Sequence, residues 1–245
     1  MHTIYDPKEI YGKRAAMPDF CRFEEISGSM ILCTVLCEDA SFAGHRGYDL
    51  RSMKKAVLNC VRDGFSAFGG STITQQLVKN LYYTFERSVS RKIGELFLAR
   101  RFEKRLTKKQ ILELYLNIIY FDNGQYGIHE AAGFYFGRTP KELSLNQSFF
   151  LASILPVVGG LNPLYHPKEF VQYRNRRATR LAAMADEETI SEILRHGPDR
   201  LDEAFCPTAS AATDRYNAPG PMLNERFGIR GTAPLALSPG GSFSE

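Results

Sequence analysis

Two glutamates, Glu38 and Glu95, stand in the sequence contexts most suited to catalysis. Glu38 opens the string EDASFAGHRGYD, and Glu95 closes the string RKIGE. Arg91 lies four residues before Glu95, so on a helix its guanidinium can lie beside the carboxylate and keep it ionised. Two carboxylates in different environments are the minimum set for chemistry at a glycosidic bond. The plainer alternative is that each glutamate is a solvated surface residue.

A segment rich in hydrogen-bond donors, GGSTITQQLVKN, spans residues 69–80. It predicts a loop that turns into a helix, with Ser71 or Thr72 as the N-cap. Helix-start amides together with the ammonium group of Lys79 suit a bound anion. The lysine lies too far beyond Gly70 for a nucleotide P-loop. The alternative interpretation is a well-capped helix with an exposed lysine.

Helical periodicity dominates the chain, whereas signals for strands are weak, so the predicted fold class is mainly α. One helix is expected to run from Ser29 into Glu38 and Asp39. The spacing of Glu38, Phe42 and His45 would place all three on one helical face. Asp49 caps an amphipathic helix over 49–62, and Thr107 caps another. Further helices are expected over residues 72–83, 88–106, 108–119, 126–136, 144–155 and 168–184.

Composition divides the 245 residues into three parts. Residues 1–28 are polar and are predicted to be an irregular N-terminal extension. Residues 29–197 carry the helical patterns and are long enough to bury one core. Residues 198–245 are rich in Pro, Gly, Ala, Ser and Thr, which predicts a poorly ordered tail or an extended appendage. No apolar stretch approaches the roughly 20 residues that cross a bilayer. The chain is therefore expected to be soluble, peripheral or without its anchor.

Charge and cysteine content exclude little by themselves. The net charge of +4 does not identify a binding partner. The segment from Lys79 to Lys109, however, contains ten Lys or Arg residues and three acidic residues. Such a basic stripe is a solvated face, or it faces phosphates, nucleic acid or anionic lipid. The five cysteines are odd in number and scattered, which argues against a disulfide framework. We interpret Cys33 and Cys37 as small core residues.

Four ordered motifs resemble those of the peptidoglycan glycosyltransferases of family 51, which are the transglycosylase modules of class A penicillin-binding proteins and their monofunctional relatives. The resemblance covers residues from about 29 to 185 of the sequence. The first motif is matched by Glu38, Asp39, Phe42, His45, Gly47, Tyr48 and Asp49. The second is matched by residues 69–80, and the third by Arg91, Lys92 and Glu95. The fourth is matched by residues 110–117. A fifth motif is matched only loosely by Arg176 and Arg177.

The resemblance implies a lysozyme-like fold with a large helical lobe and a small membrane-facing lobe that includes 49–62. It implies an enzyme that polymerises lipid II into β-1,4-linked glycan strands by an inverting mechanism, with release of undecaprenyl pyrophosphate. Glu38 matches the base that activates the sugar hydroxyl, and Glu95 matches the second essential carboxylate. Positions that bind the pyrophosphate are matched by Ser71, Gln76, Lys79 and Arg91. Supporting positions are matched by Asp39, Phe42, His45, Gly70, Thr72, Gln75, Asn80 and Lys92.

The same resemblance sets expectations for cofactors, partners and location. No cofactor is required, although Glu95 leaves open a divalent metal, Mg²⁺ or Mn²⁺, at the pyrophosphate. The expected partners are lipid II, the growing glycan strand and the membrane surface; other cell-wall synthesis proteins are left open, and nucleic acid is not expected. The expected location is the outer face of the cytoplasmic membrane in the bacterial envelope. The rival interpretations are a lysozyme-like hydrolase, a non-catalytic envelope scaffold and, on the basic stripe alone, a nucleic-acid binder.

Overall fold

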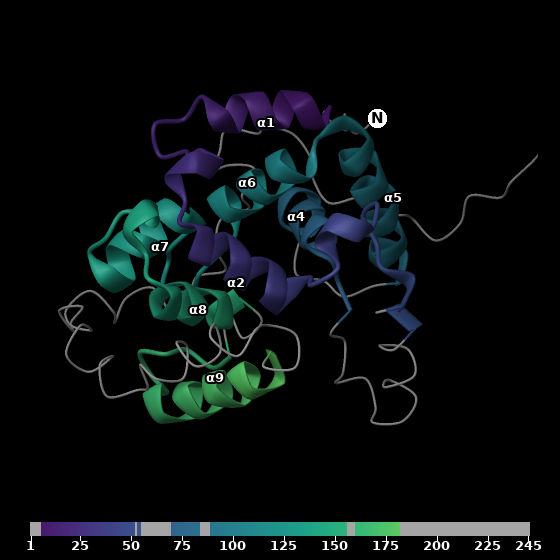
Figure 1. Cartoon of the computed structure of the whole chain (residues 1–245). Coiled ribbons are helices and arrows are strands. Elements are labelled where there is room, and N and C mark those ends of the chain that lie inside the picture. The colour runs from purple at the N-terminus through teal and green to yellow at the C-terminus, as the bar shows by residue number, and fades with distance from the viewer. Residues whose placement is uncertain (1–5, 52, 55–69, 84–88, 156–159, 182–245) are drawn as a thin grey trace, which may run out of the picture.

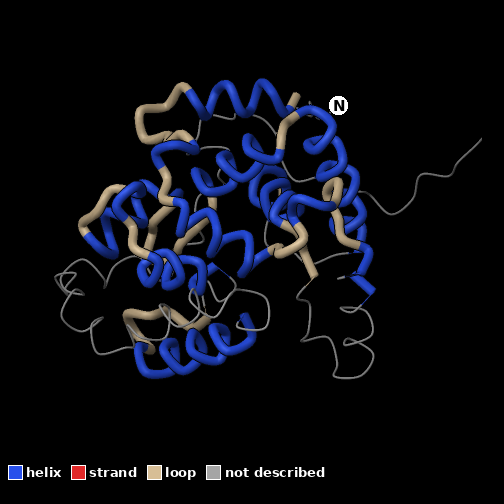
Figure 2. The backbone as a smooth tube through the Cα atoms, in the orientation of Figure 1, coloured by secondary structure: helices blue, strands red, loops and turns tan. Residues whose placement is uncertain are grey.

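The computed structural model describes residues 6–51, 53–54, 70–83, 89–155 and 160–181 (Figure 1). Within these ranges the fold is mainly α, as predicted, and its β structure is one isolated bridge between Tyr120 and Tyr126 (Figure 2). The helices, with η for 3₁₀, are α1 (Pro7–Ala15), η1 (Phe23–Glu25), α2 (Gly28–Glu38), η2 (Phe42–Gly44), α4 (Ile73–Tyr82), α5 (Val89–Arg105), α6 (Lys108–Ile118), α7 (Gly127–Phe136), η3 (Pro140–Glu142), α8 (Leu145–Ile154) and α9 (Pro167–Leu181). None of these described helices is both long and apolar enough to span a bilayer.

Local capping explains why several helices begin where the sequence predicts. Thr72 caps α4: its hydroxyl accepts from Gln75 N at 3.1 Å, and the Gln75 side chain accepts from Thr72 N at 3.0 Å. Thr107 and Gln110 make the same reciprocal pair at the start of α6. Each such cap stabilises its helix by about 1 kcal/mol. Of the two predicted caps of α4, Thr72 is therefore the one that the structure uses.

Helix α2 packs against its neighbours along one side, while Leu32 is exposed, and it ends at the candidate base. It packs along α8, while α4 packs against α5 and α6 (Figure 1). The main core contains fully buried residues such as Met30 of α2 and Leu77 of α4. A second cluster joins α2, α8 and α9, and Cys33 belongs to it, which confirms Cys33 as a small core residue. Because both clusters hold α2, the position of its last residue, Glu38, is fixed.

The prediction of an irregular N-terminal segment is wrong for residues 7–15, which form α1 across the top of α5 and α6 (Figure 1). Asp6 caps this helix, and Ile10 is buried in the main core. Periodicity missed α1 because its other large buried side chain is an arginine. Arg14 is 1% exposed and forms two hydrogen bonds to Asp19, at 2.9 and 2.7 Å. The predicted boundary at residue 29 therefore coincides with no break in packing.

The prediction that Glu38, Phe42 and His45 share one helical face is also wrong. Helix α2 ends at Glu38, and Asp39 leaves the helical region with φ −162° and ψ 73°. Phe42 then begins the separate 3₁₀ helix η2. The chain bends because the Asp39 carboxylate accepts a hydrogen bond from the backbone N of Ile73, at the start of α4.

Part of the sequence interpretation lies outside the described residues. The predicted helix over 49–62 is described only at its start, where Asp49 accepts from Arg51 N at 2.8 Å and from Met53 N at 2.9 Å. The rest of that helix and the tail over 198–245 are not among the described ranges. The small membrane-facing lobe therefore stays a prediction.

Candidate active site

Glu38 is a buried carboxylate with a partner on each oxygen. Its side chain is 6% exposed, and Oε1 accepts from Arg177 Nη2 at 2.8 Å. Oε2 accepts from Gln76 Nε2 at 2.9 Å. The carboxylate at the end of α2 is thus held by side chains from α9 and α4.

Tyr115 of α6 orients the amide that contacts Glu38. Its hydroxyl donates to Gln76 Oε1 at 3.1 Å. Burial, followed by the charge of Glu38, raises the pKa of Tyr115 well above its ordinary value, so the phenol stays protonated and remains a donor. Because the amide oxygen is occupied by this donor, the amide nitrogen of Gln76 faces Glu38. Gln76, for which the resemblance implies contact with pyrophosphate, therefore contacts the candidate base in this structure.

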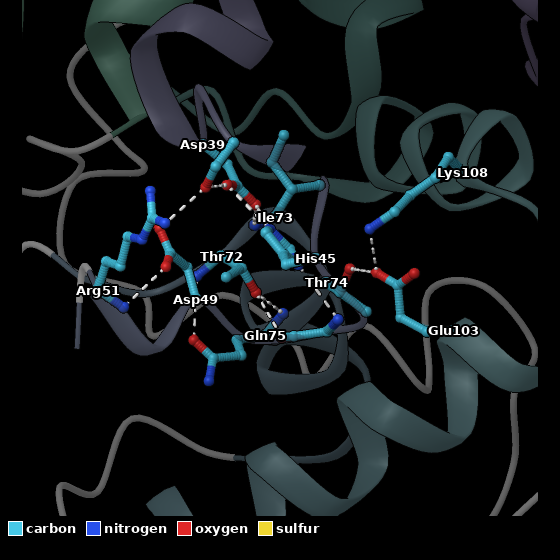
Figure 3. Close-up of polar contacts among 12 residues, drawn as sticks. Asp39, His45, Asp49, Arg51, Thr72, Ile73, Thr74, Gln75, Glu103 and Lys108 are labelled. Atoms are coloured by element: carbon cyan, nitrogen blue, oxygen red, sulfur yellow. Dashed lines mark hydrogen bonds and ion pairs between the residues drawn. The ribbon is translucent and has the colours of Figure 1, made fainter. Parts of the chain in front are cut away.

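Asp39 ties the loop after α2 to the start of α4. Its Oδ2 accepts from Ile73 N at 3.0 Å and lies 2.8 Å from His45 Nε2 (Figure 3). Asp39 is 8% exposed, so these bonds are made away from water. The two side chains therefore orient the loop that follows Glu38, which is the geometry of positioning residues.

Gly47 and Phe42 bring the same loop against α5 and α6. Gly47 has φ +101°, and a Cβ there would lie 2.9 Å from the backbone carbon of Ala99. Its carbonyl accepts from Thr72 Oγ1 at 2.7 Å. The Phe42 ring lies 4.3 Å below Lys108 Nζ, a cation–π contact. The Thr72 hydroxyl thus joins the first two motifs, and the Phe42 ring joins the loop to α6.

Glu95 is buried on α5 between two cations of the same helix. Its side chain is 3% exposed, with Lys92 Nζ 3.0 Å from Oε2 and Arg91 Nη1 3.4 Å from Oε1. The spacing prediction that Arg91 lies beside Glu95 is therefore confirmed. Lys92 Nζ also donates to Ser71 Oγ at 2.8 Å, which links α5 to the loop before α4.

The charges of both glutamates act on the ammonium group of Lys79 in α4. Burial lowers the pKa of Lys79 below its usual value, and the charges of Arg91 and Lys92 lower it further. Glu95 and Glu38 act in the opposite direction. Among the described charged groups here, the cations Lys79, Arg91, Lys92 and Arg177 outnumber the two glutamates. A cluster of this kind suits an anion with more than one negative charge.

The remaining predicted residues, Gly70, Gln75 and Asn80, belong to α4 and the loop before it. Gln75 completes the cap of α4 and is 1% exposed. Asn80 Nδ2 donates to the backbone oxygen of Gln76 at 2.8 Å, within α4. Gly70 lies in the loop that leads to Ser71 and Thr72. The contacts of Gln75 and Asn80 are those of structural residues of α4.

Arg177 also belongs to the site, although its loosely matched motif predicted no role for it. Besides Glu38, its guanidinium donates to Cys37 O at 2.5 Å and to Tyr173 Oη at 2.8 Å. Its neighbour Arg176 is exposed. The paired arginines were the available signal, but sequence spacing could not say which of the two faces inward.

Comparisons with known proteins agree on one family. A family model described as "Transglycosylase" matches residues 8–185. Penicillin-binding protein 1A of Pseudomonas aeruginosa is 42% identical over 154 residues, which are 63% of this chain and 19% of that protein. Penicillin-binding protein 1A of Aquifex aeolicus is 41% identical over 174 residues, 70% of this chain and 24% of that protein. A monofunctional glycosyltransferase of Staphylococcus epidermidis is 39% identical over 199 residues, 78% of this chain and 70% of that protein. The chain thus spans about a fifth of those penicillin-binding proteins.

Proposed function

The chain belongs to the transglycosylase family and carries a peptidoglycan glycosyltransferase domain, and from this premise we propose that it polymerises lipid II into β-1,4-linked glycan strands. The proposed mechanism is inverting and releases undecaprenyl pyrophosphate. The observation that carries the proposal is that Gln76, which donates to the buried Glu38 carboxylate at 2.9 Å, lies one turn before Lys79 on α4. Residues three apart on a helix share a face, so α4 brings the base and the lysine to one place. A base and an anion site at one place are what this transfer requires.

Glu38 is the proposed general base. The 4-hydroxyl of the incoming disaccharide is a poor nucleophile and needs a base within hydrogen-bond reach. Arg177 and Gln76 each use one lone pair of a different carboxylate oxygen, so lone pairs remain for the hydroxyl. As the hydroxyl oxygen bonds to the anomeric carbon of the growing strand, its proton passes to Glu38. The bond from that carbon to the pyrophosphate oxygen breaks, its electron pair leaves with undecaprenyl pyrophosphate, and the α link becomes β.

Lys79, Arg91, Lys92 and Ser71 are the proposed binding groups for the pyrophosphate. Charge-assisted donors stabilise the negative charge that grows on the leaving group. Glu95 holds Arg91 and Lys92 in place on α5, which is consistent with an organising role rather than with proton transfer. The rival hydrolase would have no use for such a cluster, because a glycan strand has no diphosphate leaving group.

The resemblance leaves a divalent metal open at this site. No group of three or more His, Cys, Asp or Glu that could hold a metal occurs among the described residues. Lys92 occupies Glu95 Oε2, and Oε1 makes no hydrogen bond, although Arg91 lies 3.4 Å away. We propose that Mg²⁺ or Mn²⁺, where present, is held chiefly by pyrophosphate oxygens, with Glu95 Oε1 as the contribution of the protein.

The proposed location follows from the substrate. Lipid II is anchored in the bilayer, so the domain works at the membrane surface, on the outer face of the cytoplasmic membrane. The growing strand is its second partner, and other cell-wall synthesis proteins are further proposed partners.

One assay tests the function. Purified protein is incubated with labelled lipid II, and glycan strands are separated on a gel. Wild type is expected to form strands, and Glu38→Gln, which keeps the size of the side chain, is expected to form none while its unfolding curve stays close to wild type. Strand formation by Glu38→Gln would remove the proposed base. Release of muropeptides from finished peptidoglycan would favour the hydrolase instead.

A further inference from the structure

We propose that Arg177 is a positioning residue for the base: it fixes the Glu38 carboxylate at the end of α2 and keeps it ionised. The inference rests on the proposed function, since it concerns the group that accepts the proton. It assigns a chemical role to helix α9, which carries Arg177.

The first argument is the geometry of the guanidinium. Arg177 Nη2 donates both to Glu38 Oε1 at 2.8 Å and to Cys37 O at 2.5 Å. One nitrogen therefore holds the carboxylate and the last turn of the helix that carries it. A cation at the C-terminus of a helix is also stabilised by the helix dipole. The other end of the fork, Nη1, donates to Tyr173 Oη at 2.8 Å, which anchors the guanidinium to its own helix.

The second argument is the charge around Glu38. Arg177 from α9 contacts it, and the charge of Glu38 acts on Lys79 from α4, on Tyr115 from α6 and on Cys37 of its own helix. Asp39, the next residue, turns its carboxylate toward Ile73 and His45. Of these, Arg177 is the cation in direct contact. A buried carboxylate that loses its cationic partner favours the protonated form, and a protonated base cannot accept a proton.

Arg177 itself stays charged throughout. Burial alone would lower the pKa of Arg177. The contacts with Cys37, Glu38 and Tyr173 outweigh burial and raise this pKa above the ordinary arginine value. Arg177 is therefore not deprotonated at the pH of any practical assay. Its effect on catalysis must appear through Glu38.

The position of α9 makes the contact specific. Phe170 and Ala178 are each 1% exposed, so buried packing holds this helix, and Arg174 bonds to Asn146 of α8. Arg177 is thereby turned toward Glu38, whereas the adjacent Arg176 is exposed. The pair offers a matched comparison, because the two residues differ in contact and not in type.

The test compares Arg177→Met with Arg176→Met in the full chain. Steady-state kcat and KM for lipid II are measured from pH 5.5 to 9, with an unfolding curve for each variant. In Arg177→Met we expect KM within about twofold of wild type, because pyrophosphate binding is untouched. In the plot of kcat against pH, the acid limb should shift to higher pH by about one to three units. Activity lost at pH 7 should therefore be partly regained at pH 9. Arg176→Met should match wild type.

Arg177→Lys completes the design. Lysine keeps the charge but lacks the planar fork, so the acid limb should stay near that of wild type while kcat falls about tenfold or more. A loss in Arg177→Met that is equal at every pH would assign a merely structural role and overturn the proposal, as would unchanged kcat. If Arg177→Met does not fold, Arg177→Lys decides, because wild-type kcat in that variant also overturns it. Failure of the wild-type protein to form strands would instead refute the proposed function.

Discussion

Cys21 and Asn117 lie 96 residues apart in the sequence and hydrogen-bond to each other in both directions. Cys21 N donates to Asn117 Oδ1 at 2.7 Å, and Asn117 Nδ2 donates to Cys21 O at 2.8 Å. The same amide nitrogen donates to the backbone oxygen of Glu113 at 2.8 Å, and the Glu113 carboxylate accepts from Phe23 N at 2.6 Å. Through Asn117 and Glu113 the fourth motif therefore attaches the N-terminal segment to α6, while its Tyr115 reaches Glu38 by way of Gln76.

Asn117→Ala should destabilise the protein by about 2–3 kcal/mol, because it leaves the buried N–H and C=O of Cys21 without partners. Urea denaturation measures the change. Gln172→Ala, an exposed change on α9, serves as control and should lie within about 0.5 kcal/mol of wild type. Equal stability of both variants would show that α1 and its loop are not attached through this amide.

Asp39→Ala should lower the free energy of unfolding by about 3 kcal/mol, because the buried carboxylate bonds to both Ile73 N and His45. Strand formation should fall with it, because the loop that follows Glu38 loses its link to α4. Thermal unfolding and the gel assay measure the two effects. Glu169→Ala removes an exposed carboxylate from α9 and should change neither. A stable, fully active Asp39→Ala would contradict the positioning role.

Gly47→Ala should destabilise the protein by about 2 kcal/mol, because φ is +101° and a Cβ would meet the backbone of Ala99. Gly133→Ala, within α7, is the matched control. Nothing lies within 4 Å of a Cβ at Gly133, so alanine there should stabilise the helix by about 0.5–1 kcal/mol. Differential scanning calorimetry should give midpoint shifts of opposite sign, and shifts of the same sign would contradict the proposed close approach.

Lys79→Met should make the folded protein more stable, on the order of 1 kcal/mol at pH 7, while strand formation falls about 100-fold. Burial lowers the pKa of Lys79 in the folded state, so below that pKa the folded state carries an unfavourable charge that the unfolded state holds at no cost. The advantage of methionine should shrink as pH rises toward the usual lysine value of 10.5, where the folded wild type has released the proton.

Inorganic pyrophosphate tests the same lysine as a ligand site. It should raise the unfolding midpoint of wild type and of Lys104→Met, an exposed change on α5, but not that of Lys79→Met. Equal stabilisation of all three proteins would place the anion elsewhere.

Local interactions could be predicted from the sequence, and long-range ones could not. The caps of α4 and α6 and the ion pair of Arg91 with Glu95 depend on residues three or four apart, so spacing sufficed. Helix α1 was missed because its burial depends on Asp19 and Asn117, which pair with Arg14. The prediction that Glu38, Phe42 and His45 share a face is wrong, because the backbone amide of the distant Ile73 bonds to Asp39 and ends the helix.

Glu38 and its guanidinium partner are 139 residues apart in the chain. During synthesis the carboxyl end of a nascent protein leaves the ribosome last, so α2, α4, α5 and α6 emerge before the cation that completes the candidate base. A chain interrupted before α9 would carry the proposed pyrophosphate-binding groups without the cation that positions the proposed base. On the proposed function, such a chain would be folded in part and unable to transfer.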